Sequence, residues 1–317
     1  MTCNTECYHI TKDSSEEEKG LYADHEEADT RVLLHAKHAA DHGYKAVVIT
    51  AEDTDILVLA LALNGTIGCA VYQRRGTQSR QQYIDINKMA LHHGDDVCKA
   101  IIGLHAFTGC DTVSAFAGKG KVKPLKLLQK CPDFYKCLGN LGESWELSDE
   151  QFRDFEAFTC RMYLPQLLSC CDINECRYLM FCTRKGEGDS SQLPPCHDTL
   201  YQHTLRANYQ AAIWRRSLEQ EICAPDPVGH GWTLEDNSAL GVKWMTGLPA
   251  PQTVLDLLSC NCRRVCKAPH CPCIGNGLKC TLMCKLQTCE NRLQDDEEND
   301  EGPDFHEEMD EEYEEED

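Results

Sequence analysis

The first 130 residues alternate between apolar stretches of helical period and short apolar runs. Residues 25–43 repeat alanine, valine and leucine every three or four positions and end at Gly43, which predicts a helix. The run AVVIT at 46–50 is short and β-branched, which predicts a strand buried in a parallel sheet. The run ILVLALAL at 56–63 predicts a helix that leads away from this sheet.

The alternation continues beyond residue 68. We expect two strands within 69–86 around a polar turn that contains glycine, and then a helix over roughly 87–107. A glycine-punctuated loop and a further helix follow up to residue 130. Strands and helices in this order predict an α/β fold built on a partial parallel sheet.

The remaining segments differ in composition. Residues 131–224 are predicted to be mostly helical, and the stretch 203–220 to be an amphipathic helix. Residues 225–259 form a proline-containing connector with Trp232 and Trp244, whereas residues 1–24 are polar and contain no apolar strand. The predicted organisation is a polar segment 1–24, an α/β region 25–130, a helical region 131–224, a connector 225–259, a cysteine-rich module 260–292 and an acidic tail 293–317.

Eight of the 22 cysteines lie within 260–289, with few apolar residues between them. Such a segment needs disulfides or metal in place of a hydrophobic core. C-x-C pairs suit a zinc cluster better than a disulfide, and the polar, acidic N-terminus does not resemble the signal peptide of a secreted disulfide-rich domain. We therefore expect zinc, held by Cys260, Cys262, Cys266, Cys271, Cys273, Cys280, Cys284 and Cys289.

Charge is distributed unevenly. The net charge is −21, but residues 294–317 carry sixteen acidic residues and no lysine or arginine, which leaves −5 for the rest of the chain. So acidic a run predicts a disordered tail. Such a tail serves solubility, or it competes with DNA for the basic cysteine-rich module, or it binds histones. The chain contains no apolar run of about 18 residues, so no membrane span is expected.

Five carboxylates lie at the ends of predicted elements: Glu27, Asp29, Asp53, Asp55 and Asp111. Singly, each is ordinary helix-start or turn chemistry. Gathered beside the carboxyl ends of parallel strands, they would repel one another and would be neutralised by Mg²⁺ or Mn²⁺. Two such ions can activate water for phosphodiester hydrolysis.

The cysteine run resembles the CXC domain of the tesmin/TSO1 family over residues 260–291. The match rests on CNC at 260–262, CPC at 271–273, Gly277, Asn291 and the remaining cysteines. The resemblance implies a small zinc cluster and DNA contacts, which we expect from Arg263, Arg264 and Lys267. The family has nine cysteines, and Leu286 replaces one here. Three tetrahedral zinc ions have twelve coordination positions, which nine sulfurs fill if three of the sulfurs each bridge two ions. Eight sulfurs require a fourth bridging sulfur, an outside ligand such as His270, or only two zinc ions.

The acidic motifs resemble the flap endonuclease branch of the PIN-like nucleases over residues 25–130. E-A-D at 27–29, E-D-T-D at 52–55 after a strand, and G-C-D at 109–111 before a glycine- and lysine-rich segment follow the family's order. The resemblance implies that the five carboxylates are catalytic metal ligands. It also implies that Gly118, Lys119, Gly120 and Lys121 contact phosphates.

The family's first strand, which bears an Asp, comes well before E-A-E, whereas only 26 residues precede Glu27 here. We therefore expect the chain to correspond to the second half of such a domain. The stretches 104–121 and 206–218, and the connector that leads into CNC, also resemble animal proteins that pair a nuclease-like region with a cysteine-rich segment and often derive from mobile elements.

These observations give three functional hypotheses. The first is a nuclear nucleic-acid-binding protein, derived from a Mg²⁺-dependent structure-specific nuclease and anchored to branched or single-stranded DNA by its zinc module. The second is a catalytically inactive nuclear protein that binds DNA or chromatin, the latter through its acidic tail. The third is a zinc-buffering protein, which needs the cysteines alone.

Overall fold

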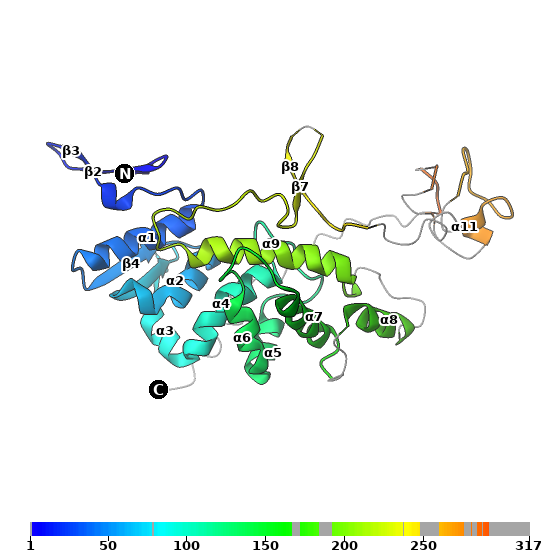
Figure 1. The fold of residues 1–317 in the computed structure, drawn as a ribbon, viewed down its shortest axis with the longest axis horizontal. Coiled ribbons are helices and arrows are strands. Elements are labelled where there is room, and N and C mark those ends of the chain that lie inside the picture. Colours follow the sequence, from blue (N-terminus) through cyan, green and yellow to red (C-terminus); the bar gives the residue numbers. More distant parts are fainter. Residues whose placement is uncertain are drawn as a thin grey trace. The chain divides into compact units, whose positions relative to one another are not determined.

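The structure is a computed structural model of the 317-residue chain, and it describes residues 2–77, 79–166, 172–183, 192–236, 238–247, 260–275, 280, 284–286 and 288–291. It divides into two compact units, Met1–Thr246 and Gly247–Asp317. The first is a mixed α/β unit with small sheets, and the second is organised around cysteines (Figure 1). The predicted acidic tail lies outside the described residues. No helix among those described is both long and apolar enough to span a bilayer.

The main sheet contains three strands in the order β4-β5-β6. β4 (Ala46–Thr50) pairs in parallel with β5 (Ala70–Arg75), and β6 (Gln82–Asp85) pairs antiparallel with β5. The predicted strand at 46–50 and the predicted strand pair within 69–86 are confirmed. The sheet is mixed, because the turn between β5 and β6 reverses the chain.

The prediction that β4 is buried was wrong. Only Ile49 of β4 is fully buried, and Val48 is 51% exposed. Among the described strands β4 pairs only with β5, so it lies at the sheet edge. Val48 and its partner Tyr72 share one face of the sheet, while Ile49 joins the core on the other.

Five helices accompany this sheet along the chain: α1 (Ala28–Asp41), α2 (Thr54–Ile67), α3 (Ile86–His93), α4 (Asp95–Thr108) and α5 (Val122–Lys130). The predicted helices at 25–43 and after 55 are confirmed. The single helix predicted over 87–107 is instead split into α3 and α4 at Gly94. The φ of Gly94 is +84°, a left-handed value that glycine adopts readily and that interrupts the helix.

The helical region contains α6 (Asp133–Asn140), α7 (Asp149–Tyr163), α8 (Ile173–Thr183) and α9 (His197–Arg215). α9 is the longest of these and packs against α4 and α7 (Figure 1). The prediction of an amphipathic α9 was wrong, because polar side chains such as Gln202, Arg206 and Asn208 are as buried as its alanines. They are accommodated by hydrogen bonds; Asn208, for example, donates to the carbonyls of residues 144 and 145.

One large hydrophobic core extends from α1 to α9 of the first unit. It includes Leu33 of α1, Leu59 of α2, Phe107 of α4 and Trp214 of α9. The Phe107 ring lies 4.7 Å from that of Phe155 in α7. The predicted α/β region 25–130 and helical region 131–224 therefore share a core.

Two segments contain strands that the sequence pattern did not predict. Residues 2–17 form an antiparallel sheet of β1 (Thr2–Cys3), β2 (Glu6–Ile10) and β3 (Ser15–Glu17), followed by the 3₁₀ turn η1 (Lys19–Leu21). The connector contains the hairpin of β7 (Trp232–Leu234) and β8 (Leu240–Val242). These strands are short and largely exposed, so they lack the apolar alternation that marks a strand in sequence.

Candidate metal centres

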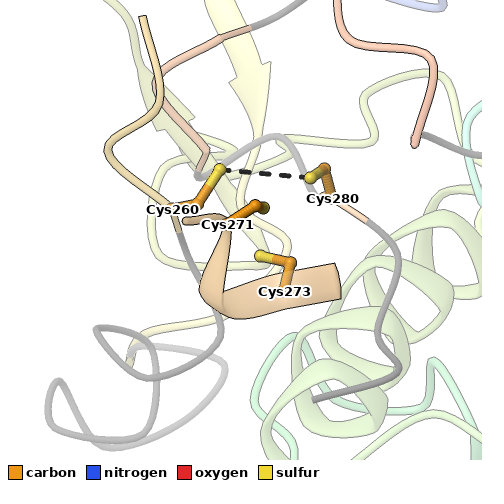
Figure 2. A group of neighbouring side chains, drawn as sticks. All are labelled: Cys260, Cys271, Cys273 and Cys280. Atoms are coloured by element: carbon orange, nitrogen blue, oxygen red, sulfur yellow. Dashed lines mark hydrogen bonds between the residues drawn. The ribbon is translucent and has the colours of Figure 1, made fainter. Parts of the chain in front are cut away.

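The cysteine cluster belongs to the second unit and is built on little regular structure. Its described helix is the short α11 (Pro272–Gly275), which begins between Cys271 and Cys273. Backbone hydrogen bonds join distant parts of the segment: the Lys285 amide donates to the Cys260 carbonyl at 2.9 Å, and the Cys280 amide to that of Asn291 at 2.9 Å. These contacts direct cysteines from separate loops towards one point (Figure 2).

Sulfur takes the place of a hydrophobic core in this unit. Six of the eight cysteines are buried, and Cys262 and Cys266 are half-buried. The Sγ atom of Cys260 lies 3.7 Å from that of Cys266 and 4.0 Å from that of Cys280 (Figure 2 shows the latter contact). Cys273 and Cys284 are 3.7 Å apart at their sulfurs. None of the eight is disulfide-bonded, so these sulfur contacts are non-covalent.

The cysteines form three sets whose sulfurs lie within 4.8 Å of one another. The sets share members, because Cys260, Cys266, Cys271 and Cys280 each belong to two of them. Cys284 lies outside the sets but contacts Cys273 and accepts a hydrogen bond from the Cys260 amide at 3.4 Å. The sets are Cys260, Cys271, Cys273 and Cys280; Cys260, Cys262, Cys266 and Cys271; and Cys266, Cys280 and Cys289. Thiolates at these separations suit tetrahedral zinc.

Burial acts against ionisation of four of these thiols. It raises the pKa of Cys260, Cys266 and Cys273, and it raises that of Cys280 to about 11. Cys271 differs, because hydrogen bonding by the backbone at Ile274 lowers its pKa to about 7. A bound cation would supply the positive charge that the buried thiolates need.

Leu286, His270 and the basic side chains have clear places in this unit. Leu286 packs against the cysteine cluster as an apolar neighbour. His270 is exposed and belongs to none of the three sets of the described residues. Arg263, Arg264 and Lys267 are exposed and project from the segment that carries Cys262 and Cys266.

The five predicted carboxylates lie at the starts of two helices and in one turn. Glu27 is the N-cap of α1 and Asp29 is in its first turn. Asp53 is the N-cap of α2, and Asp55 is in its first turn. Asp111 is exposed in the turn that follows α4. The structure thus places all five at or near the ends of helices, consistent with their predicted places at the ends of elements.

The other four carboxylates act electrostatically on Asp29. Burial raises the pKa of Asp29 to about 6, and the negative charges of Asp53, Asp55, Glu27 and Asp111 add to the effect. They are less closely packed than the cysteines, since the compact sets of three or more metal-ligand atoms in the described part of the chain all consist of cysteines. The arrangement is an acidic cluster, which we define as these five residues.

Local capping and His105, which the sequence pattern did not indicate, orient the acidic cluster. The Asp53 side chain accepts a hydrogen bond from the Asp55 amide at 2.9 Å and so caps α2. His105 of α4 contacts the Asp55 carboxylate at 2.7 Å. Burial acts to raise the pKa of Asp55, but this hydrogen bond and the positive charges of His105 and Lys121 lower it below its ordinary value.

Helix α9, which comes much later in the sequence, holds Glu27. Gln210 donates to one carboxylate oxygen at 2.8 Å, and the Trp214 indole donates to the other at 2.9 Å. The side-chain amide oxygen of Gln210 accepts a hydrogen bond from the hydroxyl of Thr112, the neighbour of Asp111, at 2.7 Å. One α9 side chain thereby links the start of α1 to the turn after α4. No short-range pattern could have indicated a contact across 183 residues.

The predicted phosphate-contacting segment 118–121 is only partly exposed. Gly118 and Gly120 are exposed, and Lys119 places its ammonium 4.1 Å from the centre of the Tyr163 ring. Lys121 turns inward and donates hydrogen bonds to the carbonyls of His105, at 3.1 Å, and Gly109. Burial lowers the pKa of Lys121. In this structure its ammonium therefore neutralises the carboxyl end of α4.

Comparisons with models of protein families, with curated proteins and with solved structures find no match in any of the three. The function of the chain is therefore inferred from the chemistry of its two candidate sites. The cysteine cluster is the more compact of the two, and its ligand type selects a definite class of metal.

Proposed function

We propose that the chain is a zinc-dependent nuclear DNA-binding protein. The observation that carries this proposal is the sharing of sulfurs in the cysteine cluster. Three tetrahedral zinc ions offer twelve coordination positions, and eight thiolates fill them if four of the thiolates bridge two metals. Four cysteines belong to two sets each: Cys260, Cys266, Cys271 and Cys280. The three sets offer eleven of the twelve positions, and Cys284, which lies beside Cys273 but belongs to no set, is the thiolate left to fill the twelfth without the ninth cysteine that Leu286 replaces.

The charge of the zinc module favours DNA as its partner. Three zinc ions would offset six of the eight thiolate charges, and the segment 260–292 has six lysines and arginines against one glutamate. The loaded module would be cationic, with Arg263, Arg264 and Lys267 exposed on it. Exposed guanidinium and ammonium groups of this kind bind phosphates. The resemblance of 260–291 to CXC domains supports the same partner.

The proposal is tested by measuring zinc and DNA on the same variants. Full-length protein is expected to bind about three zinc ions and to bind a fluorescein-labelled duplex in fluorescence anisotropy. Replacing Arg263, Arg264 and Lys267 with glutamine should leave the zinc content unchanged and lower the salt dependence, −dlogK/dlog[salt], by about 2 to 3. The double variant Cys260→Ser, Cys271→Ser should lose zinc and DNA binding together, whereas Cys223→Ser, outside the cluster, should lose neither. Zinc binding with no DNA binding would favour a zinc-buffering protein instead.

A second candidate function is divalent-metal-dependent hydrolysis of DNA at the acidic cluster. The observation that favours it is the clustering of four carboxylates around Asp29, whose pKa is raised to about 6 first by burial and then by their negative charges. Mg²⁺ or Mn²⁺ would neutralise these oxygens and could activate a water for phosphodiester hydrolysis. The resemblance of residues 25–130 to PIN-like, flap-endonuclease-like domains agrees with this chemistry.

Asp53→Asn is the sharpest test of hydrolysis, because asparagine keeps the N-cap of α2 while it removes the charge. Asp85→Asn is the matched control, since Asp85 caps α3 in the same way outside the cluster. With Mn²⁺ and flap, bubble and single-stranded substrates, Asp53→Asn and Asp111→Asn should each abolish cleavage and Asp85→Asn should not. If the wild-type protein cuts none of these substrates, the protein is a non-catalytic DNA binder.

A further inference from the structure

A pocket of about 350 Å³ lies in the first unit beside the turn that bears Asp111. Its walls come from residues 110–115, from α9 and from the end of the β7–β8 hairpin. Apart from Asp111, its lining belongs to neither candidate metal centre. Its lining includes the side chains of Asp111, Arg206 and Trp244. The volume falls within the range of about 300–1,000 Å³ that small-molecule sites occupy.

Arg206 gives this pocket a buried positive charge without a counterion. The residue is 1% exposed. Its Nη1 donates to the carbonyls of Gly231, at 3.0 Å, and Lys243, at 2.9 Å, whereas its Nη2 is shielded from water and has no hydrogen-bond partner among the described residues. None of the ion pairs formed by the residues that the structure describes involves Arg206.

A buried guanidinium in this state is costly, because neither water nor a carboxylate compensates its charge. Arginine is also always protonated near neutral pH, so loss of the proton cannot remove the cost. An anionic oxygen next to the guanidinium would compensate its charge and, on reaching Nη2, would give that atom the acceptor that it lacks. The structure therefore favours an anionic ligand at this position.

The backbone around Arg206 fixes this arrangement. Gly231 adopts a φ of +92°, and a Cβ there would lie 2.6 Å from the Cγ of Arg206 and 2.5 Å from the Gln202 carbonyl. Glycine is therefore required for the loop before β7 to approach α9 so closely. The approach holds the guanidinium in one place instead of letting it swing into solvent.

Trp244 gives the same pocket an exposed aromatic surface. The residue is 58% exposed, and its ring centre lies 5.6 Å from the guanidinium carbon of Arg206. A flat, exposed indole with a guanidinium over its ring and no carboxylate counterion matches a ligand that joins an aromatic ring to an anion. A nucleotide has both parts, and stacking of bases on aromatic side chains is the usual way in which single strands are bound.

We propose that this pocket binds one nucleotide of single-stranded DNA, with the phosphate at Arg206 and the base stacked on Trp244. The inference rests on the proposed function, to which it adds a second DNA contact in the first unit. The Asp111 carboxylate repels phosphate, so the phosphate lies on the Arg206 side of the pocket. A strand held there would pass beside the acidic cluster, because Asp111 belongs to both.

The experiment uses zinc-loaded full-length protein and two probes. Binding of fluorescein-labelled dT12 is measured by anisotropy, and binding of thymidine 5′-monophosphate by calorimetry. Trp244→Ala should weaken dT12 binding by about 5- to 150-fold, the range expected for loss of one stacked base. Tyr83→Ala is the matched control, because Tyr83 is also 58% exposed but lies on β6. Its affinity for dT12 should stay within about twofold of wild type, as for a residue that contacts no base.

Arg206→Lys provides a second variant, which keeps the charge and loses the planar fork. It should weaken dT12 binding while urea unfolding shows that the protein is still folded. Binding of the free mononucleotide would identify a site for a single nucleotide, whereas binding of dT12 alone would identify a site that needs the phosphodiester chain. Either outcome supports the pocket when Trp244→Ala and Arg206→Lys weaken the same binding.

The inference is overturned if Trp244→Ala and Arg206→Lys both bind dT12 like wild type, or if the wild-type protein binds neither probe. Duplex binding by the cysteine variants is measured separately. If duplex binding depends on zinc while dT12 binding ignores Trp244, the pocket is not a DNA site and the proposed function stands. If the duplex is not bound in the presence of zinc, the proposed function fails by itself.

Discussion

Asp29 is a carboxylate whose ionisation lowers the free energy of unfolding of the first unit. Its pKa is raised to about 6, firstly by burial and then by the four other members of the acidic cluster. An acid whose folded pKa lies above its unfolded value destabilises the protein as pH rises through that interval. The ionised side chain thus lowers the free energy of unfolding at neutral pH and has no such effect below about pH 4.

Asp29→Asn is therefore expected to stabilise the first unit at pH 7.5. The gain should be about 1 kcal/mol once solvent screening of this half-buried group is considered, and it should vanish as pH falls from about 6 to 4. Urea unfolding at several pH values, without Mg²⁺ or Mn²⁺, measures it. Asp149→Asn is the control, because Asp149 is in the first turn of α7 and outside the cluster. Equal effects of the two substitutions at pH 7.5 would contradict the prediction.

Gln210 joins two parts of the acidic cluster through its single amide. Gln210→Leu removes a donor to Glu27 and the acceptor of Thr112, so both lose a partner in a partly buried environment. We expect a loss of about 2 to 3 kcal/mol in the free energy of unfolding, since one of the hydrogen bonds involves a carboxylate. Gln82→Leu, at an exposed position of β6, should change stability by no more than about 0.5 kcal/mol. Comparable losses in the two variants would show that Gln210 has no such linking role.

At the scale of elements, close contact between α4 and α6 positions the acidic cluster. α4 carries His105, which contacts Asp55, and its carboxyl end leads into the turn of Asp111. Gly103 of α4 faces α6, where an added Cβ would lie 2.1 Å from the Leu138 carbonyl oxygen. The two helices can therefore pack at this distance only because residue 103 has no side chain.

Gly103→Ala should force these helices apart and destabilise the first unit by roughly 3 kcal/mol, as overpacking of a close interface does. Gly65→Ala is the matched control within a helix. Gly65 lies in α2 with nothing within 4 Å of the added Cβ, so alanine there should stabilise by about 0.5 to 1 kcal/mol. Thermal unfolding followed by circular dichroism measures both variants. A neutral Gly103→Ala would show that the helices can separate freely.

For the molecule as a whole, the two units depend on different forces. The first is stabilised by a continuous hydrophobic core, whereas sulfurs fill the centre of the second. A zinc chelator should therefore abolish duplex binding while it leaves the helical circular dichroism signal and the urea midpoint of the first unit unchanged. Added zinc should restore duplex binding. A collapse of the helical signal on chelation would mean that the first unit also requires zinc.

The sequence by itself determined those features that depend on neighbouring residues. The helical period predicted α1 and α2, the β-branched run predicted β4, and the cysteine spacing predicted the cluster. Capping, periodicity and ligand spacing act over a few residues, so they can be recognised in a linear pattern. The same reasoning failed for β4 burial and for α9, because burial depends on partners elsewhere in the chain.

Only the tertiary structure decided which distant groups meet. Gln210 and Trp214 reach Glu27 from the other end of the first unit, and Arg206 lines a pocket with Trp244 and Asp111. The four shared sulfurs likewise become apparent only when the loops of the cysteine cluster are folded together. Each of these contacts joins residues whose proximity results from packing of the whole core or cluster. No local pattern encodes such packing, since its free energy is distributed over many side chains.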